Sequence, residues 1–345
     1  MEKHEKYMQR CLQLAKNGLG NTYPNPLVGS VIVHNNKIIG EGFHTKAGEN
    51  HAEINAINSV KNKSLLKSST IYVNLEPCSH YGKTPPCAKK IADLKIPRVV
   101  IGTLDTNIKV AGRGVKILNN AGTKVITHVL KNESREINKR FFTFHEKQRP
   151  YIILKWAQSA DGFIDPIRSS DTPIAPYWIT GKHERQLVHK WRTEEQAILV
   201  GKNTVLKDNP MLTSRNWNGN NPIRIVIDRY LSISHELNIF NNSAKTIIFN
   251  YLENSTSEIQ EYIKIKKTKN ELEQILSILH KKNILSVIIE GGAKTHQSFI
   301  DNNYFDEAKI FVGNTFFKAG TKAAKIDFLK QKEITNFENS KLFLF

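Results

Sequence analysis

Two runs of alternating strand and helix patterns, separated by Gln148-Arg149-Pro150, restrict the folds open to this sequence. In the first run, β-rich segments such as Val28–Val33 are followed by helical patterns, and the alternation starts again at Ile152–Trp156. Strands and helices that alternate in this way form sheets covered by helices, the α/β class. The chain of 345 residues is also too long for one ordinary core. We therefore expect two α/β domains, residues 1–146 and 147–345.

Hydrophobic spacing and turn residues predict the main elements of both halves. In the first half we expect helices at His4–Lys16, Ala52–Val60, from Cys87 onward and at Glu133–His145, with strands at Val28–Val33, Lys37–Phe43, Ile71–Leu75 and Val99–Thr103. In the second half we expect helices at His183–Arg192 and Glu271–Lys281, with strands at Ile152–Trp156, Ala197–Val200, Ile223–Asp228, Thr246–Phe249, Val287–Glu290 and Lys309–Val312. We interpret Thr204–Arg215 as a polar loop.

The sequence offers no segment suited to a membrane or to export. Apolar runs such as Tyr151–Leu154 end after a few residues, whereas a membrane span needs about 18. The charged N-terminus has no apolar segment behind it, so we expect no signal peptide. The 3 cysteines are too few for a disulfide framework. We therefore expect a cytoplasmic protein with no membrane partner.

The formal net charge of +18 favours an anionic partner. The excess of lysine and arginine is spread over both halves and does not form a basic tail. The densest basic run, Lys264–Lys269, has no interleaved aromatic side chain on which bases could stack, and we interpret it as solvated surface. Phosphorylated small molecules satisfy this charge as well as nucleic acid does.

One group of residues in the first half has the composition of a catalytic zinc site. His51-Ala52-Glu53 opens a predicted helix, and Pro77-Cys78 and Cys87 follow a predicted strand. Imidazole and thiolates are preferred zinc ligands, and three of them leave a position for the water that zinc activates. Glu53 stands two residues after His51, close enough to shuttle protons for that water. His-x-Glu followed by Pro-Cys is the arrangement of zinc nucleobase deaminases, although their second cysteine usually comes sooner.

Two other interpretations of these residues stay open. Cys78 and Cys87 could be small buried hydrophobic residues with His51 on the surface. A closed structural zinc site would need a fourth ligand, for which His44 and His80 are the candidates. Cys11, on the apolar face of the first predicted helix, is expected in the core and not at the metal.

The long spacing between Cys78 and Cys87 resembles the deaminase domain of the bifunctional riboflavin-biosynthesis deaminase/reductase family. The segments 24–29, 42–44 and 51–53 carry the same resemblance, as Pro-Asn-Pro-Leu-Val-Gly, Gly-Phe-His and His-Ala-Glu. This resemblance implies a cytidine-deaminase-like three-layer fold. It further implies that the domain hydrolyses the 2-amino group of 2,5-diamino-6-(5-phosphoribosylamino)pyrimidin-4(3H)-one. It also implies zinc on His51, Cys78 and Cys87, Glu53 as proton shuttle, and Asn25, His44, His80 and Lys83 around the substrate.

The second half carries a different set of motifs. They are Leu154–Gly162, Trp178-Ile179-Thr180, Thr204–Arg215 and Val287–Gly292, where paired glycines end a buried strand before a helix. Backbone N–H groups at such a helix start can approach a phosphate. No Gly-x-Gly-x-x-Gly follows a strand, so the common dinucleotide-binding fingerprint is missing.

In this order the motifs resemble the reductase domain of the same family, which is dihydrofolate-reductase-like and uses NADPH to reduce the phosphoribosyl group to a ribityl chain. The resemblance implies two sets of contacts. NADPH would contact Ala157, Trp178, Thr204, Asp208, Gly292, Ala293, Lys294, Thr295, His296, Gln297 and Ser298. The substrate would contact Arg192, Leu212, Arg215 and Glu290, with the arginines suited to its phosphate. Lys155 could polarise the open-chain sugar carbonyl, or it could be an ordinary exposed lysine.

The second half departs from the family at three places. The segment between Gly162 and Trp178 is longer than expected, and Pro176 stands where the family usually has a substrate-contacting serine. Arg229 replaces a small residue after Asp228. These departures concern individual binding residues more than the domain itself.

We therefore expect a zinc- and NADPH-dependent bifunctional enzyme that takes a phosphorylated pyrimidine, binds no nucleic acid and forms a homo-oligomer. A nucleic-acid base deaminase with a C-terminal binding module is one alternative. A deaminase with an inactive reductase-like domain is another, and a non-catalytic zinc scaffold would be favoured only if Glu53 proved dispensable.

Overall fold

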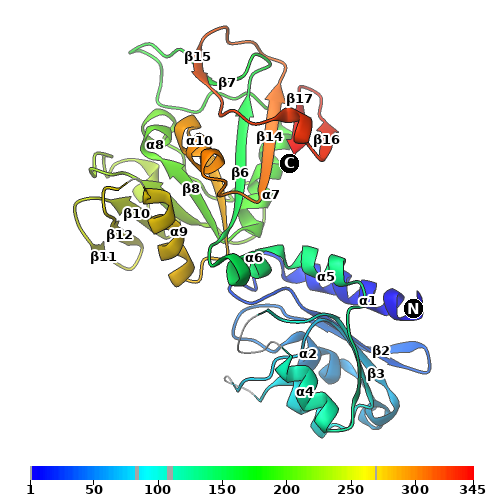
Figure 1. Ribbon diagram of the computed structural model, residues 1–345. Coiled ribbons are helices and arrows are strands. Elements are labelled where there is room, and N and C mark those ends of the chain that lie inside the picture. Colours follow the sequence, from blue (N-terminus) through cyan, green and yellow to red (C-terminus); the bar gives the residue numbers. More distant parts are fainter. Residues whose placement is uncertain (1, 82–84, 107–111, 269) are drawn as a thin grey trace. The chain divides into compact units, whose positions relative to one another are not determined.

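The computed structural model describes residues 2–81, 85–106, 112–268 and 270–345, which form two compact units (Figure 1). Unit 1 is Met1–Gln148 and unit 2 is Arg149–Phe345. Each unit has its own sheet and its own core, so each is described by itself. No helix of the described residues is long and apolar enough to span a membrane.

Unit 1 contains a five-stranded sheet in the order β2-β1-β3-β4-β5, in which β3, β4 and β5 are parallel. Its strands are β1 (Gly29–His34), β2 (Lys37–Phe43), β3 (Thr70–Leu75), β4 (Arg98–Thr103) and β5 (Lys124–Ile126). Its helices are α1 (Glu2–Ala15), η1 (Lys16–Gly18), α2 (Ala52–Ser59), η2 (Lys63–Ser68), α3 (Cys87–Asp93), α4 (Arg113–Asn120), α5 (Lys131–Ile137) and α6 (Lys139–Lys147).

Side chains along the strands of unit 1 point alternately to the two faces of the sheet, and both faces are buried. Val31 and Val33 on β1 pack with Met8 and Cys11 of α1, whereas Ile32 packs against the other face with Ile57 of α2. Successive side chains of a strand point to opposite faces, so one apolar strand can serve two cores. The three-layer arrangement expected for this half is therefore confirmed (Figure 1).

Unit 2 contains a ten-stranded sheet in the order β11-β12-β10-β9-β8-β13-β6-β14-β17-β16. Neighbours from β12 to β14 are parallel, and antiparallel strands add to both edges. The strands are β6 (Tyr151–Gln158), β7 (Phe163–Pro166), β8 (Ala197–Gly201), β9 (Ile223–Ile227), β10 (Thr246–Asn250), β11 (Ser255–Thr256), β12 (Gln260–Lys264), β13 (Ser286–Gly291), β14 (Glu307–Gly313), β15 (Gly320–Lys322), β16 (Glu333–Asn336) and β17 (Ser340–Leu344). A separate two-stranded sheet joins β7 to β15.

Helices cover both faces of the large sheet. They are α7 (Lys182–Glu194), α8 (Lys202–Asp208), η3 (Asn238–Phe240), α9 (Glu271–Lys281), α10 (Ala293–Asp301) and η4 (Phe328–Lys330). The face formed with α9 and α10 carries the largest apolar cluster, which includes Leu154, Ile275 and Phe299. The opposite face is covered by α7 and α8 through Trp191 and Val205.

Two element predictions are wrong. Residues 133–145 do not form one helix, because α5 ends at Ile137 and α6 begins at Lys139. The break lies at Asn138, whose side chain accepts a hydrogen bond from the Leu27 N–H at 2.8 Å and donates one to the Leu27 carbonyl at 2.9 Å. Thr204–Arg215 is not entirely a loop, because α8 runs from Lys202 to Asp208 and buries Val205.

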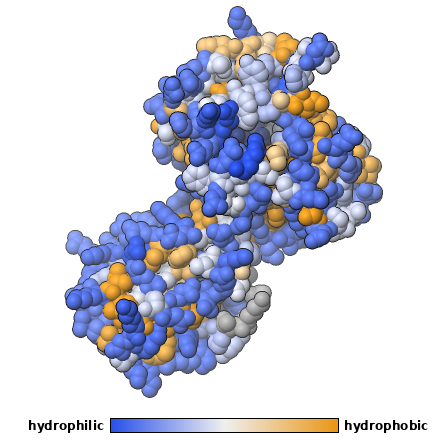
Figure 2. Space-filling model, turned by 180° about the vertical axis from the view of Figure 1, so that it is seen from behind, coloured by the Kyte–Doolittle hydropathy of each residue, from blue (hydrophilic) through white to orange (hydrophobic). Residues whose placement is uncertain are grey.

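The surface seen from behind is mainly hydrophilic, with apolar residues interspersed on both units (Figure 2). The exposed large apolar side chains of unit 2 include Ile167, Ile174, Tyr177 and Trp178, all between β7 and α7. That segment borders the cavity described below.

Candidate active sites

Three metal-binding side chains of unit 1 meet where β3 and two helices come together. His51 precedes the first residue of α2, Cys78 follows β3, and Cys87 is the first residue of α3. Cys78 is held from both sides, since its sulfur accepts the Cys87 N–H at 3.2 Å and its carbonyl accepts the Ala88 N–H at 3.2 Å. The start of α3 thus holds both thiols beside the imidazole.

The donor set fits a zinc ion. One donor atom from each of His51, Cys78 and Cys87 lies within 4.8 Å of the other two, and both sulfurs are 3.5 Å from Nδ1 of His51. A tetrahedral zinc with ordinary bond lengths would separate its sulfur and nitrogen ligands by about 3.6 Å. No other such group occurs among the described residues. His51 Nδ1 is therefore the ring nitrogen suited to the metal.

The three donor groups of this cluster share protons that a metal ion would displace. Hydrogen bonds from Cys87 and from His51 lower the pKa of the Cys78 thiol to about 4, and the bond to Cys78 raises the pKa of His51 to about 9. A thiolate is the form of cysteine that binds a metal. A bound cation would replace the proton that His51 and the two sulfurs otherwise share.

Glu53 lies in the first turn of α2, two residues beyond His51, with a side chain that is 3% exposed. Burial raises the pKa of this carboxyl to about 7, and the charge of Cys78 acts in the same direction. A carboxyl that titrates near neutral pH can both accept and release a proton there. Its placement matches the role of proton shuttle expected from the sequence.

His44 and Asn25 lie beside the cluster and contact each other. Nε2 of His44 is 3.0 Å from the Asn25 amide nitrogen, Nδ1 is 3.1 Å from the Asn50 carbonyl, and the ring packs edge-on against His51. Both ring nitrogens are therefore engaged, and burial lowers the His44 pKa below its ordinary value. His44 is not a fourth metal ligand in this arrangement. His80 is exposed, and Lys83 lies outside the described residues.

Glu76 is a buried carboxylate that sequence reasoning missed. It accepts hydrogen bonds from the backbone N–H groups of Asp105, Gly112 and Val115 at 3.0 to 3.3 Å. These bonds tie the segment after β3 to the start of α4. Only the position of Glu76 before Pro77 and Cys78 could have indicated this role.

The second candidate site is a cavity of about 980 Å³ in unit 2, at the carboxyl ends of β6, β8, β9 and β13. Ligands of open α/β sheets bind at this edge. Most residues expected from the sequence line the cavity, namely Lys155, Ala157, Trp178, Arg192, Thr204, Asp208, Leu212, Arg215, Glu290, Gly292, Ala293, Lys294, Thr295, His296 and Ser298. Gln297 does not line it, and its side chain instead bonds Asp301 and the Lys325 N–H.

The paired glycines allow β13 and α8 to approach closely in this cavity. Gly291 has a φ of +143°, a conformation that residues with a side chain rarely adopt. A Cβ on Gly291 would lie 3.1 Å from the Thr204 hydroxyl oxygen, and one on Gly292 would lie 3.4 Å from it. The glycines therefore let Thr204 face the start of α10.

A buried charge network forms one wall of the cavity. The Glu290 carboxylate accepts two hydrogen bonds from Arg192, at 3.0 and 2.8 Å, and lies 3.7 Å from Nζ of Lys155. Burial opposes ionisation of Glu290, but Arg192 and Lys155 together outweigh it and lower its pKa to about 2. The Lys155 side chain is 15% exposed, so the interpretation of Lys155 as an ordinary exposed lysine is wrong.

Arg192 and Arg215, the two arginines expected to bind the substrate phosphate, differ in how far protein groups already occupy their N–H donors. The guanidinium fork of Arg192 is directed at Glu290, and its Nη1 donates to the Thr213 carbonyl at 3.0 Å. Arg215 is exposed and has no carboxylate partner among the described residues. His189, which the sequence did not indicate, also lines this wall, and burial with the nearby arginines lowers its pKa to about 4.

Both units match known families. Residues 1–103 match the cytidine and deoxycytidylate deaminase zinc-binding region, and residues 150–337 match the RibD C-terminal domain. Among whole proteins, the riboflavin biosynthesis protein RibD of Aquifex aeolicus is 41% identical over 314 residues, covering 89% of this chain and 86% of the relative. The RibD protein of Bacillus amyloliquefaciens is 38% identical, covering 90% of this chain and 86% of its own.

Two solved structures match this chain over nearly its whole length. A diaminohydroxyphosphoribosylaminopyrimidine deaminase/5-amino-6-(5-phosphoribosylamino)uracil reductase from Thermotoga maritima has a TM-score of 0.88 at 37% identity and covers 99% of this chain and 98% of its own. RibD from Acinetobacter baumannii has a TM-score of 0.88 at 31% identity with the same coverage.

Proposed function

The chain belongs to the RibD family of bifunctional riboflavin-biosynthesis enzymes, and we propose how its two units divide the work. It is a deaminase and a reductase that uses zinc and NADPH. In our proposal unit 1 hydrolyses the 2-amino group of 2,5-diamino-6-(5-phosphoribosylamino)pyrimidin-4(3H)-one. Unit 2 then reduces the ribosyl chain of the deaminated product to a ribityl chain.

The deamination proposal is supported by the cluster of His51, Cys78 and Cys87 with Glu53 beside it. When bound, zinc supplies an activated water as nucleophile. The Glu53 carboxylate would accept a proton from that water as the water oxygen bonds to the ring carbon. It would then deliver the proton to the amino group, which leaves as ammonia when the carbon–nitrogen bond breaks. His44 and Asn25, which contact each other next to His51, would orient the pyrimidine.

The reduction proposal is supported by the charge network on the wall of the unit 2 cavity. When bound, NADPH supplies the hydride that adds to the open-chain sugar carbon. Lys155 would donate a hydrogen bond from Nζ to the sugar carbonyl oxygen, and Glu290 keeps that ammonium in place. Arg215 has no carboxylate partner within the described part of the chain, and it would bind the substrate phosphate, while Arg192 orients Glu290.

One assay tests both activities. The purified chain is given the diaminopyrimidine phosphate with and without NADPH, and ammonia and NADPH absorbance are followed together. We expect ammonia in both reactions and NADPH oxidation only when both compounds are present. Ammonia release without any NADPH oxidation, even with the deaminated compound as substrate, would leave a deaminase with an inactive reductase-like unit.

Metal analysis tests the ligand assignment separately. Cys78→Ala and Cys87→Ala should each lose bound zinc, because neither leaves enough ligands to hold the ion. Cys11→Ala should keep it, since Cys11 is fully buried between α1 and the sheet. Zinc retained by either of the first two variants would show that a ligand has been misassigned.

We also propose that the enzyme works in the cytoplasm as a homo-oligomer and does not act on nucleic acid. A small-molecule substrate for unit 2 is supported by its cavity of about 980 Å³, which is of a size suited to small molecules. Light scattering of the purified chain measures its oligomeric state. Excess RNA should leave ammonia release unchanged, whereas competitive inhibition would favour a nucleic-acid deaminase.

A further inference from the structure

The connection between β7 and α7 crosses the reductase cavity without a helix or strand of its own. This segment, residues 167–181, contributes Arg168 and the run from Pro176 to Thr180 to the cavity lining. Long connections without secondary structure in a compact domain usually have a functional role, such as a binding loop. Side-chain contacts must hold such a segment in place, because its backbone makes few regular hydrogen bonds.

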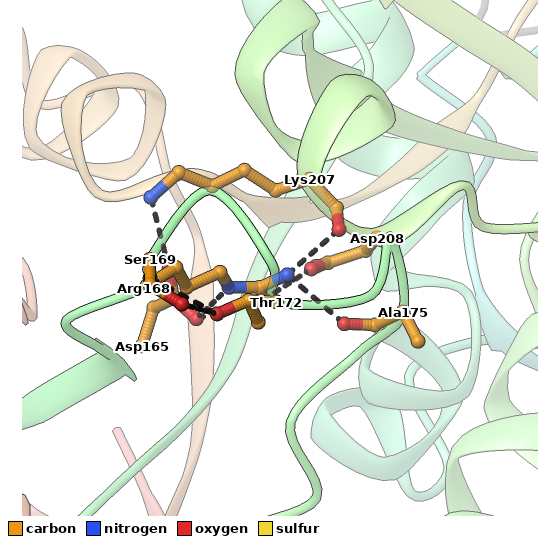
Figure 3. Close-up of polar contacts among 7 residues, drawn as sticks. All are labelled: Asp165, Arg168, Ser169, Thr172, Ala175, Lys207 and Asp208. Atoms are coloured by element: carbon orange, nitrogen blue, oxygen red, sulfur yellow. Dashed lines mark hydrogen bonds and ion pairs between the residues drawn. The ribbon is translucent and has the colours of Figure 1, made fainter.

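Arg168 supplies that attachment through almost all of its N–H groups (Figure 3). Nε donates to Asp165 at 2.8 Å, and Nη2 donates to Asp208 at 2.7 Å. Nη1 donates to two backbone carbonyls, those of Ala175 at 3.0 Å and Lys207 at 2.7 Å. The side chain is 14% exposed. One guanidinium therefore links the end of β7, the returning arm of the segment and the last turn of α8.

The charges around Arg168 are balanced. Lys207 approaches the second oxygen of Asp165 at 2.9 Å, so two cations face the two carboxylates of Asp165 and Asp208. The Lys207 carbonyl lies in the last turn of α8, where carbonyls lack helical partners and a cation is favourable. Because its N–H groups are already directed at protein oxygens, Arg168 has little capacity left for a phosphate.

The groups that Arg168 joins carry two different walls of the cavity. Ala175 immediately precedes Pro176, Tyr177 and Trp178, and the Trp178 ring stacks on the Arg185 guanidinium at 4.5 Å. The other wall is α8, which carries Thr204 and Asp208. Trp178, Thr204 and Asp208 are the residues expected to contact NADPH, so the distance between the two walls matters for the cofactor.

We propose that Arg168 is a positioning residue of the reductase site, which fastens the segment 167–181 to the carboxyl end of α8 and so sets the width of the NADPH site between Trp178 and Asp208. The proposal rests on the proposed function, in which this cavity holds NADPH. Arg168 acts through Trp178 and Asp208 and does not itself touch the reacting atoms.

The test is direct titration of the full-length chain with NADPH, together with steady-state kinetics of reduction. Arg168→Ala should raise the Kd and the KM for NADPH about tenfold or more, the effect of losing a set of charge-assisted hydrogen bonds. The KM for the deaminated pyrimidine should change much less. Arg168→Lys keeps the charge but cannot span four acceptors, so it should recover only part of the affinity.

Asp165→Asn gives a second variant that weakens the same attachment without removing a group from either wall. Its effect on the NADPH Kd should have the same direction as that of Arg168→Ala, and the double variant should show less than the sum of the two. Lys282→Ala, which breaks an ion pair with Glu261 outside the cavity lining, is the matched control and should leave the Kd unchanged.

Three outcomes overturn the inference. They are an NADPH Kd within about twofold of the wild type in Arg168→Ala, a larger change in pyrimidine KM than in NADPH KM, and additive effects in the double variant. Ammonia release by the same chains reports on unit 1, and if Arg168→Ala proves unfolded, Arg168→Lys and Asp165→Asn decide. A wild-type chain that binds no NADPH would instead refute the proposed function itself.

Discussion

At the scale of single residues, each candidate site holds a buried ionisable group whose pKa is displaced from its ordinary value. Burial raises the pKa of Glu53 to about 7, and burial lowers the pKa of Lys155 from its ordinary value. The first group can thus exchange protons near neutral pH, and in the second the Glu290 carboxylate opposes the effect of burial. Displaced values of this kind cluster at functional sites.

Glu53→Gln should abolish ammonia release while leaving zinc bound. The amide cannot accept a proton, and the loss should be at least about 10²- to 10⁴-fold, as for other general acid–base groups. Reduction of the deaminated substrate by the same chain should persist. Glu41→Gln, in the same unit but paired with Arg10 at the surface, is the matched control and should release ammonia normally. Near-normal ammonia release by Glu53→Gln would exclude the proposed proton shuttle.

Glu290→Gln should move the alkaline limit of the reduction rate to lower pH. The carboxylate raises the pKa of Lys155, so its removal lets burial and Arg192 lower that pKa further. Lys155 then loses its proton, and its ability to polarise a carbonyl, at a lower pH. The pH profile of kcat measures the shift, and the exposed Glu273→Gln serves as control. An alkaline limit that stays in place would show that Lys155 does not govern the rate.

The candidate reactive residues could be selected from the sequence, but their partners could not. His51, Cys78, Cys87 and Glu53 belong to one local pattern, and the structure brings the three donor atoms within 4.8 Å. The fork of Arg192, by contrast, is directed at Glu290, which is distant in sequence. Such pairings depend on the packing of α7 against β13 and leave no periodic signal in the chain.

At the scale of elements, predictions were accurate where burial imposes a period. The bounds of α9 (Glu271–Lys281) agree with the expected range, since its apolar residues recur at helical spacing and Ile275, Leu276 and Leu279 are buried. The bounds of β2 (Lys37–Phe43) also agree, because the turn at Asn35-Asn36 fixes where the strand begins. The short helix α8 was missed because only Val205 of its residues is buried. The split between α5 and α6 was missed because Asn138 bonds the backbone of Leu27, a contact far along the chain.

The packing of β2 against α2 makes Gly42→Ala a test of how the elements hold the metal. A Cβ at Gly42 would lie 2.7 Å from the Asn55 side chain, so α2 would have to move, and α2 follows His51 directly and carries Glu53. We expect a loss of about 1–3 kcal/mol in the stability of unit 1, typical of overpacking, together with weaker zinc binding.

Thermal unfolding and zinc competition with a chelator measure both effects of Gly42→Ala. Ile38→Ala, on the same strand but 41% exposed, should cost less than about 0.5 kcal/mol and leave zinc affinity unchanged. Equal zinc affinity in Gly42→Ala and the wild type would mean that the position of α2 does not limit the metal site.

At the scale of the whole molecule, each unit has its own sheet, its own apolar clusters and its own candidate site. The chain passes from one unit to the other at Gln148, which has a φ of +53° and follows the last residue of α6. The next residue already belongs to unit 2, since Arg149 donates two hydrogen bonds to Asp306, at 2.6 and 2.9 Å. A division between 148 and 149 thus breaks neither core.

We therefore predict that residues 1–148 alone bind zinc and release ammonia, and that residues 149–345 alone oxidise NADPH with the deaminated substrate. With roughly 150 and 200 residues, both fragments are long enough for an independent core. A fragment beginning at Leu154 is the matched control, because it lacks Arg149 and the first residues of β6 and leaves Asp306 without its cation. It should unfold at lower temperature than the 149–345 fragment. If the 149–345 fragment folds but binds neither NADPH nor substrate, the reductase site needs more than unit 2, and the proposed division of labour fails.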